Sequence, residues 1–85
     1  MARTPGNEQN RWFREVFAAE IRAEMARQRV SGRELARRIG ESPQWVSHRV
    51  NAVQSIDTDD IPRFADALGM STADLLRQVA DAIRE

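Results

Sequence analysis

The chain has 85 residues, equal numbers of basic and acidic side chains (13 of each) and no cysteine, so it can build one small domain with a modest core. The absence of cysteine excludes disulfides and thiolate metal sites, and a single histidine cannot hold a metal ion alone. No apolar run is long enough to cross a membrane and the first residues lack the apolar core of a secretion signal, so we expect a cytoplasmic protein of a bacterial cell.

The first ten residues are polar and contain proline and glycine. They predict a flexible arm over residues 1–10, followed by a single domain over residues 11–85. A first helix is predicted over residues 11–28, and its aromatic beginning packs either on the last helix or on a second copy of the chain. Its apolar residues recur every four positions, at Phe13, Phe17, Ile21 and Met25.

A second helix is predicted over residues 31–39. Its start, Ser31-Gly32-Arg33-Glu34, has the form of a capping box, in which the side chains of Ser31 and Glu34 each accept a hydrogen bond from the other residue's N–H group. Gly40 ends the helix, because glycine adopts the left-handed backbone required there without steric penalty. The buried side consists of Leu35, Ala36 and Ile39.

A third helix is predicted over residues 43–51, with Ser42 as its N-cap and Pro43 in its first turn. Val46 and Val50 form its buried side. At about 100° per residue, the opposite side carries four small polar residues, Gln44, Ser47, His48 and Asn51. Such side chains can bind base edges and phosphate oxygens, and none carries a negative charge that DNA would repel. The alternative interpretation is an ordinary solvated helix face.

Residues 52–57 show no periodicity and predict a loop, in which Gln54 and Ser55 can donate hydrogen bonds to phosphates. Residues 58–60 offer side-chain caps for a fourth helix over residues 61–69, whose start is limited by Pro62. A last helix over residues 72–83 either pairs with a second copy of the chain or closes the core around Trp12 and Phe13. Its apolar candidates for a homodimer contact are Leu75, Leu76, Val79 and Ile83.

Residues 16–76 resemble the Cro and lambda-repressor type of helix-turn-helix protein, also called XRE-like. The marks of this family are Glu34-Leu35-Ala36 in the scaffold helix, Gly40 in the turn, Val46 in the recognition helix and Asn51 at its end. The resemblance implies an all-α, compact five-helix domain whose helix 43–51 enters the major groove of DNA.

Two positions depart from the family's pattern, because Arg49 stands where an apolar residue is usual and Ala52 where glycine is usual. If Val50 takes the core position instead, the recognition helix is rotated slightly and Arg49 can reach a base or a phosphate. Trp45 lies about 100° from the centre of the buried face. It either closes the edge of the core, which we favour, or touches DNA sugars.

The charge of the chain is unevenly distributed although it sums to zero. Residues 22–49 carry seven arginines and three glutamates, whereas residues 50–85 carry three arginines and seven acids. The predicted helix-turn-helix is therefore the basic part, and this asymmetry would orient the protein on a polyanion. All basic residues are arginine, which indicates a GC-rich coding sequence such as those of actinobacteria and their phages.

The sequence thus predicts a sequence-specific regulator of transcription that binds a double-stranded DNA operator, as a Cro-like repressor of a phage or prophage does. Predicted base-reading residues are Gln44, Ser47, His48 and Arg49. Predicted phosphate-binding residues are Arg33, Arg37, Arg38, Ser42, Asn51, Gln54 and Ser55. Two alternatives are an antitoxin that represses its own operon and a protein-binding adaptor without DNA affinity. We expect no catalytic residues, cofactor, metal or small-molecule ligand.

Overall fold

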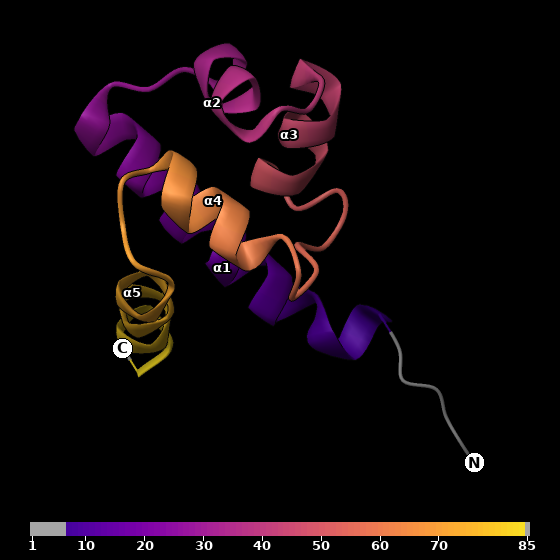
Figure 1. Ribbon diagram of the computed structural model, residues 1–85. Coiled ribbons are helices and arrows are strands. Elements are labelled where there is room, and N and C mark those ends of the chain that lie inside the picture. The colour runs from indigo at the N-terminus through magenta and orange to yellow at the C-terminus, as the bar shows by residue number, and fades with distance from the viewer. Residues whose placement is uncertain (1–6, 85) are drawn as a thin grey trace.

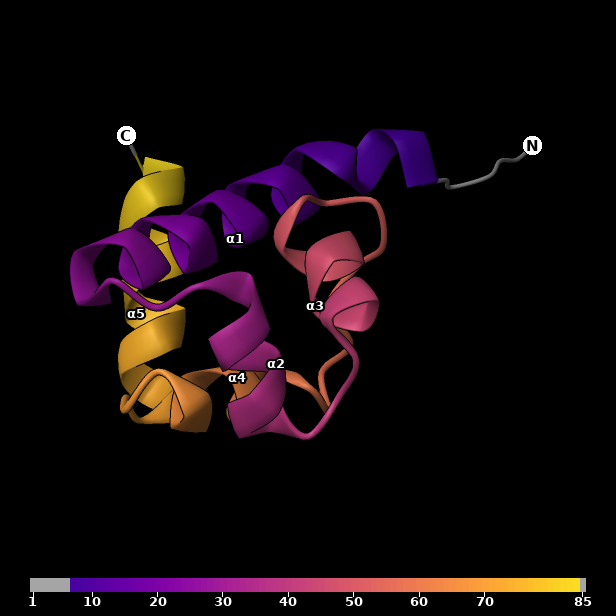
Figure 2. The same ribbon diagram turned by 90° about the horizontal axis from the view of Figure 1, so that it is seen from above.

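The computed structural model describes residues 7–84, which form five helices and no strand (Figures 1 and 2). The helices are α1 (Asn7–Gln28), α2 (Gly32–Ile39), α3 (Pro43–Val50), α4 (Ile61–Ala67) and α5 (Thr72–Arg84). The predicted all-α, five-helix fold is therefore confirmed. Helix α1 begins four residues before the predicted start, so residues 7–10 are helical and do not belong to an arm. Residues 1–6 of the predicted arm lie outside the described residues.

The long helix α1 runs along one side of the molecule, with α2, α3 and α4 below it and α5 crossing it in Figure 2. Helix α5 crosses the C-terminal half of α1, where Gln78 Nε2 donates to Glu24 Oε1 at 3.4 Å. The N-terminal half of α1, with Trp12 and Phe13, extends instead over the loop that follows α3 (Figure 2). Of the two predicted alternatives for this aromatic beginning, the structure does not bear out packing on the last helix, because Trp12 and Phe13 lie beside α3 and the loop after it. The alternative of a contact with a second copy stays a prediction.

The core contains side chains from all five helices. The largest fully buried side chains are Phe64, Ile21, Leu35, Leu68, Leu75 and Val46. The predicted buried side of α3 is confirmed, because Val46 and Val50 are buried. In α2 the prediction is confirmed for Leu35 and Ala36, whereas Ile39 is only partly buried against the core. The four apolar residues of α5 that were predicted for a homodimer contact differ in burial. Leu75 and Val79 belong to the core, whereas Leu76 and Ile83 are exposed.

Helix α4 differs from its prediction at both ends. Asp60 occupies the N-cap position but makes no side-chain cap bond, because its carboxylate accepts a hydrogen bond from Arg63 Nη1 at 3.0 Å. The predicted capping is therefore wrong for this residue. The helix ends at Ala67, two residues early, and Gly69 follows with a left-handed φ of +70°.

The final carbonyl groups of the three short helices accept hydrogen bonds from arginines that belong to other helices. These donor and acceptor pairs are Arg63 and Ile39 (3.2 Å), Arg22 and Val50 (2.6 Å), and Arg38 and Ala67 (3.0 Å). Carbonyls in the last turn have no partner within their own helix and lie at the negative end of its dipole, so a guanidinium is favoured there. Arg22 thereby connects α1 to the end of α3. Helices α2 and α4 are connected twice, because each donates an arginine to the last carbonyl of the other.

Ala52 has a left-handed backbone with φ of +61°, at the position where the family's pattern has glycine. A side chain in this conformation costs roughly 1–2 kcal/mol. Ala52→Gly is therefore expected to raise the free energy of unfolding, measured by urea denaturation, by about 1 kcal/mol after the greater flexibility of unfolded glycine is subtracted. The control Ala80→Gly, on the exposed side of α5, should lower it by about 1 kcal/mol. An A52G variant no more stable than the parent would contradict the expectation.

Candidate nucleic-acid interface

Helices α2 and α3 each begin at a serine cap, and a short turn joins them. Ser31 Oγ accepts from the Glu34 N–H at 3.0 Å, and Ser42 Oγ accepts from the Trp45 N–H at 3.1 Å. Gly40 ends α2 with φ of +87°. The predicted caps and turn are confirmed. The second half of the predicted capping box is wrong, because the Glu34 carboxylate binds arginines of its own helix instead of the Ser31 N–H.

Three of the four polar residues predicted on the outer side of α3 are exposed, namely Gln44, Ser47 and Asn51, and His48 is half-buried. Asn51 Nδ2 donates to the backbone oxygen of Ser47 at 3.0 Å and to its Oγ at 3.2 Å. No acidic side chain belongs to α3. The helix therefore presents an outer side with hydrogen-bonding groups and without negative charge.

Trp45 packs at the edge of the core, as the favoured interpretation predicted. Its ring stacks on Phe64 with a centroid distance of 5.8 Å and an interplanar angle of 15°. On the Trp45 ring lies the guanidinium of Arg49, 4.0 Å from the centroid, and Arg49 Nη1 donates to the Trp45 carbonyl at 3.1 Å. Such cation–π packing covers the aromatic ring with the long side chain.

Arg49 consequently does not join the other three predicted base-reading residues. Its side chain lines a hollow of about 520 Å³ between the start of α1 and the loop after α3, together with Phe13 and Val53. Of the rotation of α3 considered from the sequence, one part is observed, because Val50 occupies a core position. The other part is not observed, because the Arg49 side chain lies on the Trp45 ring instead of extending outward.

A second groove, of about 550 Å³, lies between α1 and the helix-turn-helix. It brings Arg33, one of the predicted phosphate-binding residues, together with Ser47, Asn51 and Arg22. Arg22 was not among the predicted site residues. A signal for it exists in the sequence, because the positions three and four residues away in α1 hold only alanine and methionine and therefore offer it no acidic partner.

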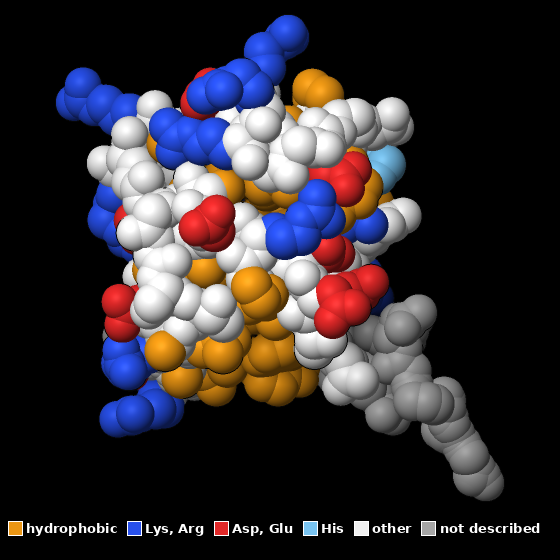
Figure 3. Space-filling model, in the orientation of Figure 1, with side chains coloured by type: hydrophobic (Ala, Val, Ile, Leu, Met, Phe, Trp, Pro, Cys, Tyr) orange, Lys and Arg blue, Asp and Glu red, His pale blue; other side chains and the backbone are white. Residues whose placement is uncertain are grey.

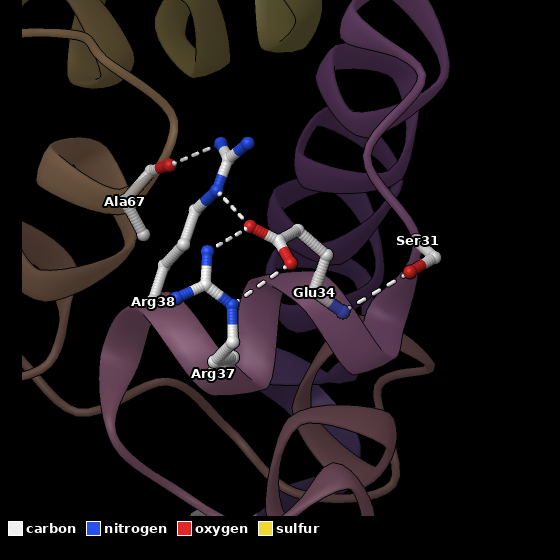
Figure 4. Close-up of polar contacts among 5 residues, drawn as sticks. All are labelled: Ser31, Glu34, Arg37, Arg38 and Ala67. Carbon is white, nitrogen blue, oxygen red and sulfur yellow. Dashed lines mark hydrogen bonds and ion pairs between the residues drawn. The ribbon is translucent and has the colours of Figure 1, made fainter.

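Arg37 and Arg38, also predicted at phosphates, share the carboxylate of Glu34 (Figure 4). Arg37 Nε donates to Glu34 Oε1 at 3.0 Å and Arg38 Nε donates to Oε2 at 2.9 Å. The Arg37 side chain is 72% exposed, so it can exchange this partner for a phosphate at little cost. Arg38 is more restrained, since its Nη1 also binds the Ala67 carbonyl of α4.

The remaining predicted phosphate ligands lie at the two ends of α3. Ser42 is exposed, with its oxygen engaged as the cap. Gln54 and Ser55 are exposed in the loop after α3, where the Gln54 N–H binds the His48 carbonyl at 3.0 Å. Arginine side chains gather over α2 at the top of Figure 3, whereas acidic side chains are more frequent lower down, over α4 and its preceding loop.

Hydrogen bonds from Arg37 and Arg38 hold the pKa of Glu34 at about 2, below its ordinary value of 4.5. A lowered carboxyl pKa stabilises the fold above pH 4.5, and this contribution is lost as the pH falls to about 2. Glu34→Gln is therefore expected to lose less stability than the parent between these pH values, measured by thermal unfolding. Glu15→Gln, at an exposed position of α1 with no ion pair among residues 7–84, serves as the control. Equal pH dependence of parent and E34Q would refute the expectation.

Within residues 7–84, no helix is both long enough and apolar enough to cross a lipid bilayer. The same part of the chain brings no three side chains of histidine, aspartate or glutamate together as a metal site.

Comparison with known proteins places the chain among DNA-binding folds. The model of a family described as "Helix-turn-helix domain" matches residues 16–79. Two solved structures of the clp gene regulator ClgR from Corynebacterium glutamicum are similar. One is 30% identical with a TM-score of 0.74, covering 82% of this chain and 91% of that one. The other is 29% identical with a TM-score of 0.75, covering 85% and 77% respectively. No curated protein matches the sequence.

Proposed function

This chain belongs to the helix-turn-helix domain family, and we propose that it represses transcription in the manner of a Cro-like protein, on an operator of a phage or prophage. It is a DNA-binding transcriptional regulator. The observation that carries the proposal is the outer side of α3, which is polar, free of acids and held in place by capped helix ends. Such a helix fits the major groove of B-DNA, where base edges can be read.

We assign base reading to Gln44, Ser47 and His48, the polar residues on this side of α3. The Gln44 amide can pair with adenine through two hydrogen bonds. We leave Arg49 out of this set because its guanidinium packs on Trp45. Phosphate contacts are assigned to Arg22, Arg33, Arg37, Gln54 and Ser55, with the N–H groups at the starts of α2 and α3.

A homodimer is part of the proposal, because a two-fold operator needs two recognition helices about 34 Å apart. Apolar side chains gather on the lower face of Figure 3, between α5 and the N-terminal half of α1. The exposed large apolar residues of these two helices are Trp12, Phe13, Leu76 and Ile83. This face supports a contact with a second copy through α5, although the buried Leu75 and Val79 contribute only through the core.

The proposal is tested by titrating the protein onto DNA from upstream of its own gene and onto scrambled DNA of equal length, at two salt concentrations. We expect a preference for the upstream DNA of about a hundredfold or more that weakens as salt increases. Equal and weak binding to both DNAs would contradict repression at its own promoter. Footprinting then reports whether the protected site is a near-palindrome.

An antitoxin is the second candidate, and the same exposed apolar face favours it, because an antitoxin needs a surface for its toxin. An adaptor without DNA affinity is favoured only by the zero net charge of the chain. Co-purification with the product of a neighbouring gene would support the antitoxin. The absence of salt-dependent binding to DNA would support the adaptor.

A further inference from the structure

We propose that Asn51 is a positioning residue that fixes the Ser47 hydroxyl as a hydrogen-bond donor toward DNA, so that Ser47 reads an acceptor atom on a base edge. This inference rests on the proposed function and replaces the phosphate contact predicted for Asn51. It follows from the two hydrogen bonds that connect the side chain of Asn51 to Ser47, one turn earlier in the chain.

The orientation of the Asn51 amide is determined by its first partner. Its nitrogen lies 3.0 Å from the backbone oxygen of Ser47. A carbonyl oxygen can only accept hydrogen bonds, so the group facing it must be the NH₂ of the amide and not its oxygen. The orientation is therefore set by chemistry and does not depend on distinguishing nitrogen from oxygen by shape.

The second partner determines what Ser47 can do. The same nitrogen lies 3.2 Å from Ser47 Oγ, which therefore accepts a hydrogen bond from Asn51. A serine hydroxyl carries one hydrogen. Among residues 7–84, no acceptor takes that hydrogen, and Ser47 is exposed on the outer side of α3. The hydroxyl consequently points a donor outward.

Asn51 itself is poorly suited to a phosphate in this arrangement. Its NH₂ hydrogens are engaged by Ser47, and the atom left free is the amide oxygen, which is an acceptor like the phosphate oxygens. Its contribution to DNA binding is then made through Ser47. Arg33 and Arg22, which line the same groove, supply positive charge for the nearby backbone.

A donor on Ser47 favours some bases over others. In the major groove guanine presents the acceptors N7 and O6, adenine presents N7 and thymine presents O4, whereas cytosine presents only the N4 amino donor. The base that Ser47 contacts should therefore be any base except cytosine. A phosphate oxygen is also an acceptor, and the experiment below separates the two sources because a phosphate contact is independent of sequence.

The test is selection from a pool of random 20-base-pair duplexes, followed by sequencing of the bound fraction. For the parent protein we expect one position in each half-site at which cytosine is depleted about tenfold or more. Ser47→Ala should abolish this depletion, and Ser47→Thr, which keeps a hydroxyl, should retain it. Asn51→Ala should restore the frequency of cytosine at that position in the bound fraction. The base preference at the position contacted by Gln44 should not change.

Asn51→Asp provides a sharper variant of nearly identical shape. Its carboxylate can only accept, so it takes the Ser47 hydrogen and leaves Oγ as an acceptor toward DNA. We expect cytosine to become favoured at the same position. The added negative charge also lowers affinity for all DNA, and the Ser47→Ala/Asn51→Asp double variant measures that loss without the hydroxyl. Circular dichroism confirms that each variant is folded.

Three outcomes would overturn the inference. If Asn51→Ala weakens binding to all duplexes equally and cytosine stays excluded, Asn51 binds a phosphate directly. If Ser47→Ala loses affinity without any change in base preference, the acceptor is a phosphate. In both cases the parent still selects a sequence, so the proposed function survives. If the folded parent selects no sequence at all, the proposed function fails together with the inference.

Discussion

Phe64→Ala is expected to lower the free energy of unfolding by about 3–5 kcal/mol, the largest effect of any single change considered for this protein. Phe64 is fully buried in α4, and its ring stacks on Trp45 beneath the recognition helix. The substitution removes that stacking and leaves a cavity that the surrounding helices can only partly fill. A small domain has a total stability of about 5–15 kcal/mol, so the variant should lose between about a fifth and nearly all of it.

The measurement is urea unfolding followed by circular dichroism and by tryptophan fluorescence. Val53→Ala is the matched control, because it also truncates an apolar side chain but at a position that is 60% exposed. It should change the free energy of unfolding by about 0.5 kcal/mol or less. A loss of under about 1 kcal/mol for Phe64→Ala would show that Trp45 and the recognition helix do not depend on this ring.

Gln44→Ala is expected to weaken binding to the operator by about 1–3 kcal/mol while binding to unrelated DNA stays nearly unchanged. Gln44 is exposed on the outer side of α3, so its truncation leaves the core intact. The measurement is a pair of titrations, one on the footprinted operator and one on scrambled DNA, with urea unfolding to verify equal stability. An equal loss on both DNAs would exclude base reading by this side chain.

Arg33→Ala is the contrasting variant. Its guanidinium is exposed at the start of α2 and has no ion pair among residues 7–84. Removing a phosphate contact should weaken binding to both DNAs and reduce the salt dependence by about one ion. A salt slope that does not change would place Arg33 away from the phosphates.

The helix ends and buried sides were predictable because they depend on neighbours in the sequence. Ser31 and Ser42 cap the helices that follow them, and Gly40 takes the left-handed backbone that ends α2. The buried position of Val50 followed from a period of about 3.6 residues. These are contacts within one or two turns of the chain, for which residue type and spacing are sufficient information.

Other features were not predictable because they depend on residues that are distant in the sequence or on competing partners. Arg49 turns back onto Trp45 because Phe64 of α4 holds that ring in place. Glu34 does not form the predicted capping bond, because its carboxylate accepts stronger, charge-assisted hydrogen bonds from two arginines. The early start of α1 belongs to the same class, since that helix extends over the loop that follows α3.

The exposed residues of the candidate site were predictable only in part. Helical spacing was sufficient to place Gln44 and Ser47 on the outer side of α3. It could not show that Asn51 turns its amide toward Ser47, because a rotamer is chosen by the available hydrogen bonds and not by spacing. Nor could it show that Arg22 of α1 reaches the end of α3, 28 residues away.

Arginines from neighbouring helices hold the last carbonyls of α2, α3 and α4, and this arrangement determines how the protein opens. Helices of seven or eight residues are unstable in isolation, and fraying of one last turn deprives another helix's arginine of its acceptor. Local openings of α2 and α4 are thus coupled to each other, and their amide hydrogens should exchange with solvent together. Helix α3 is held instead by Arg22 of the long helix α1, so it would meet DNA already docked on α1 and not as a segment that folds upon binding.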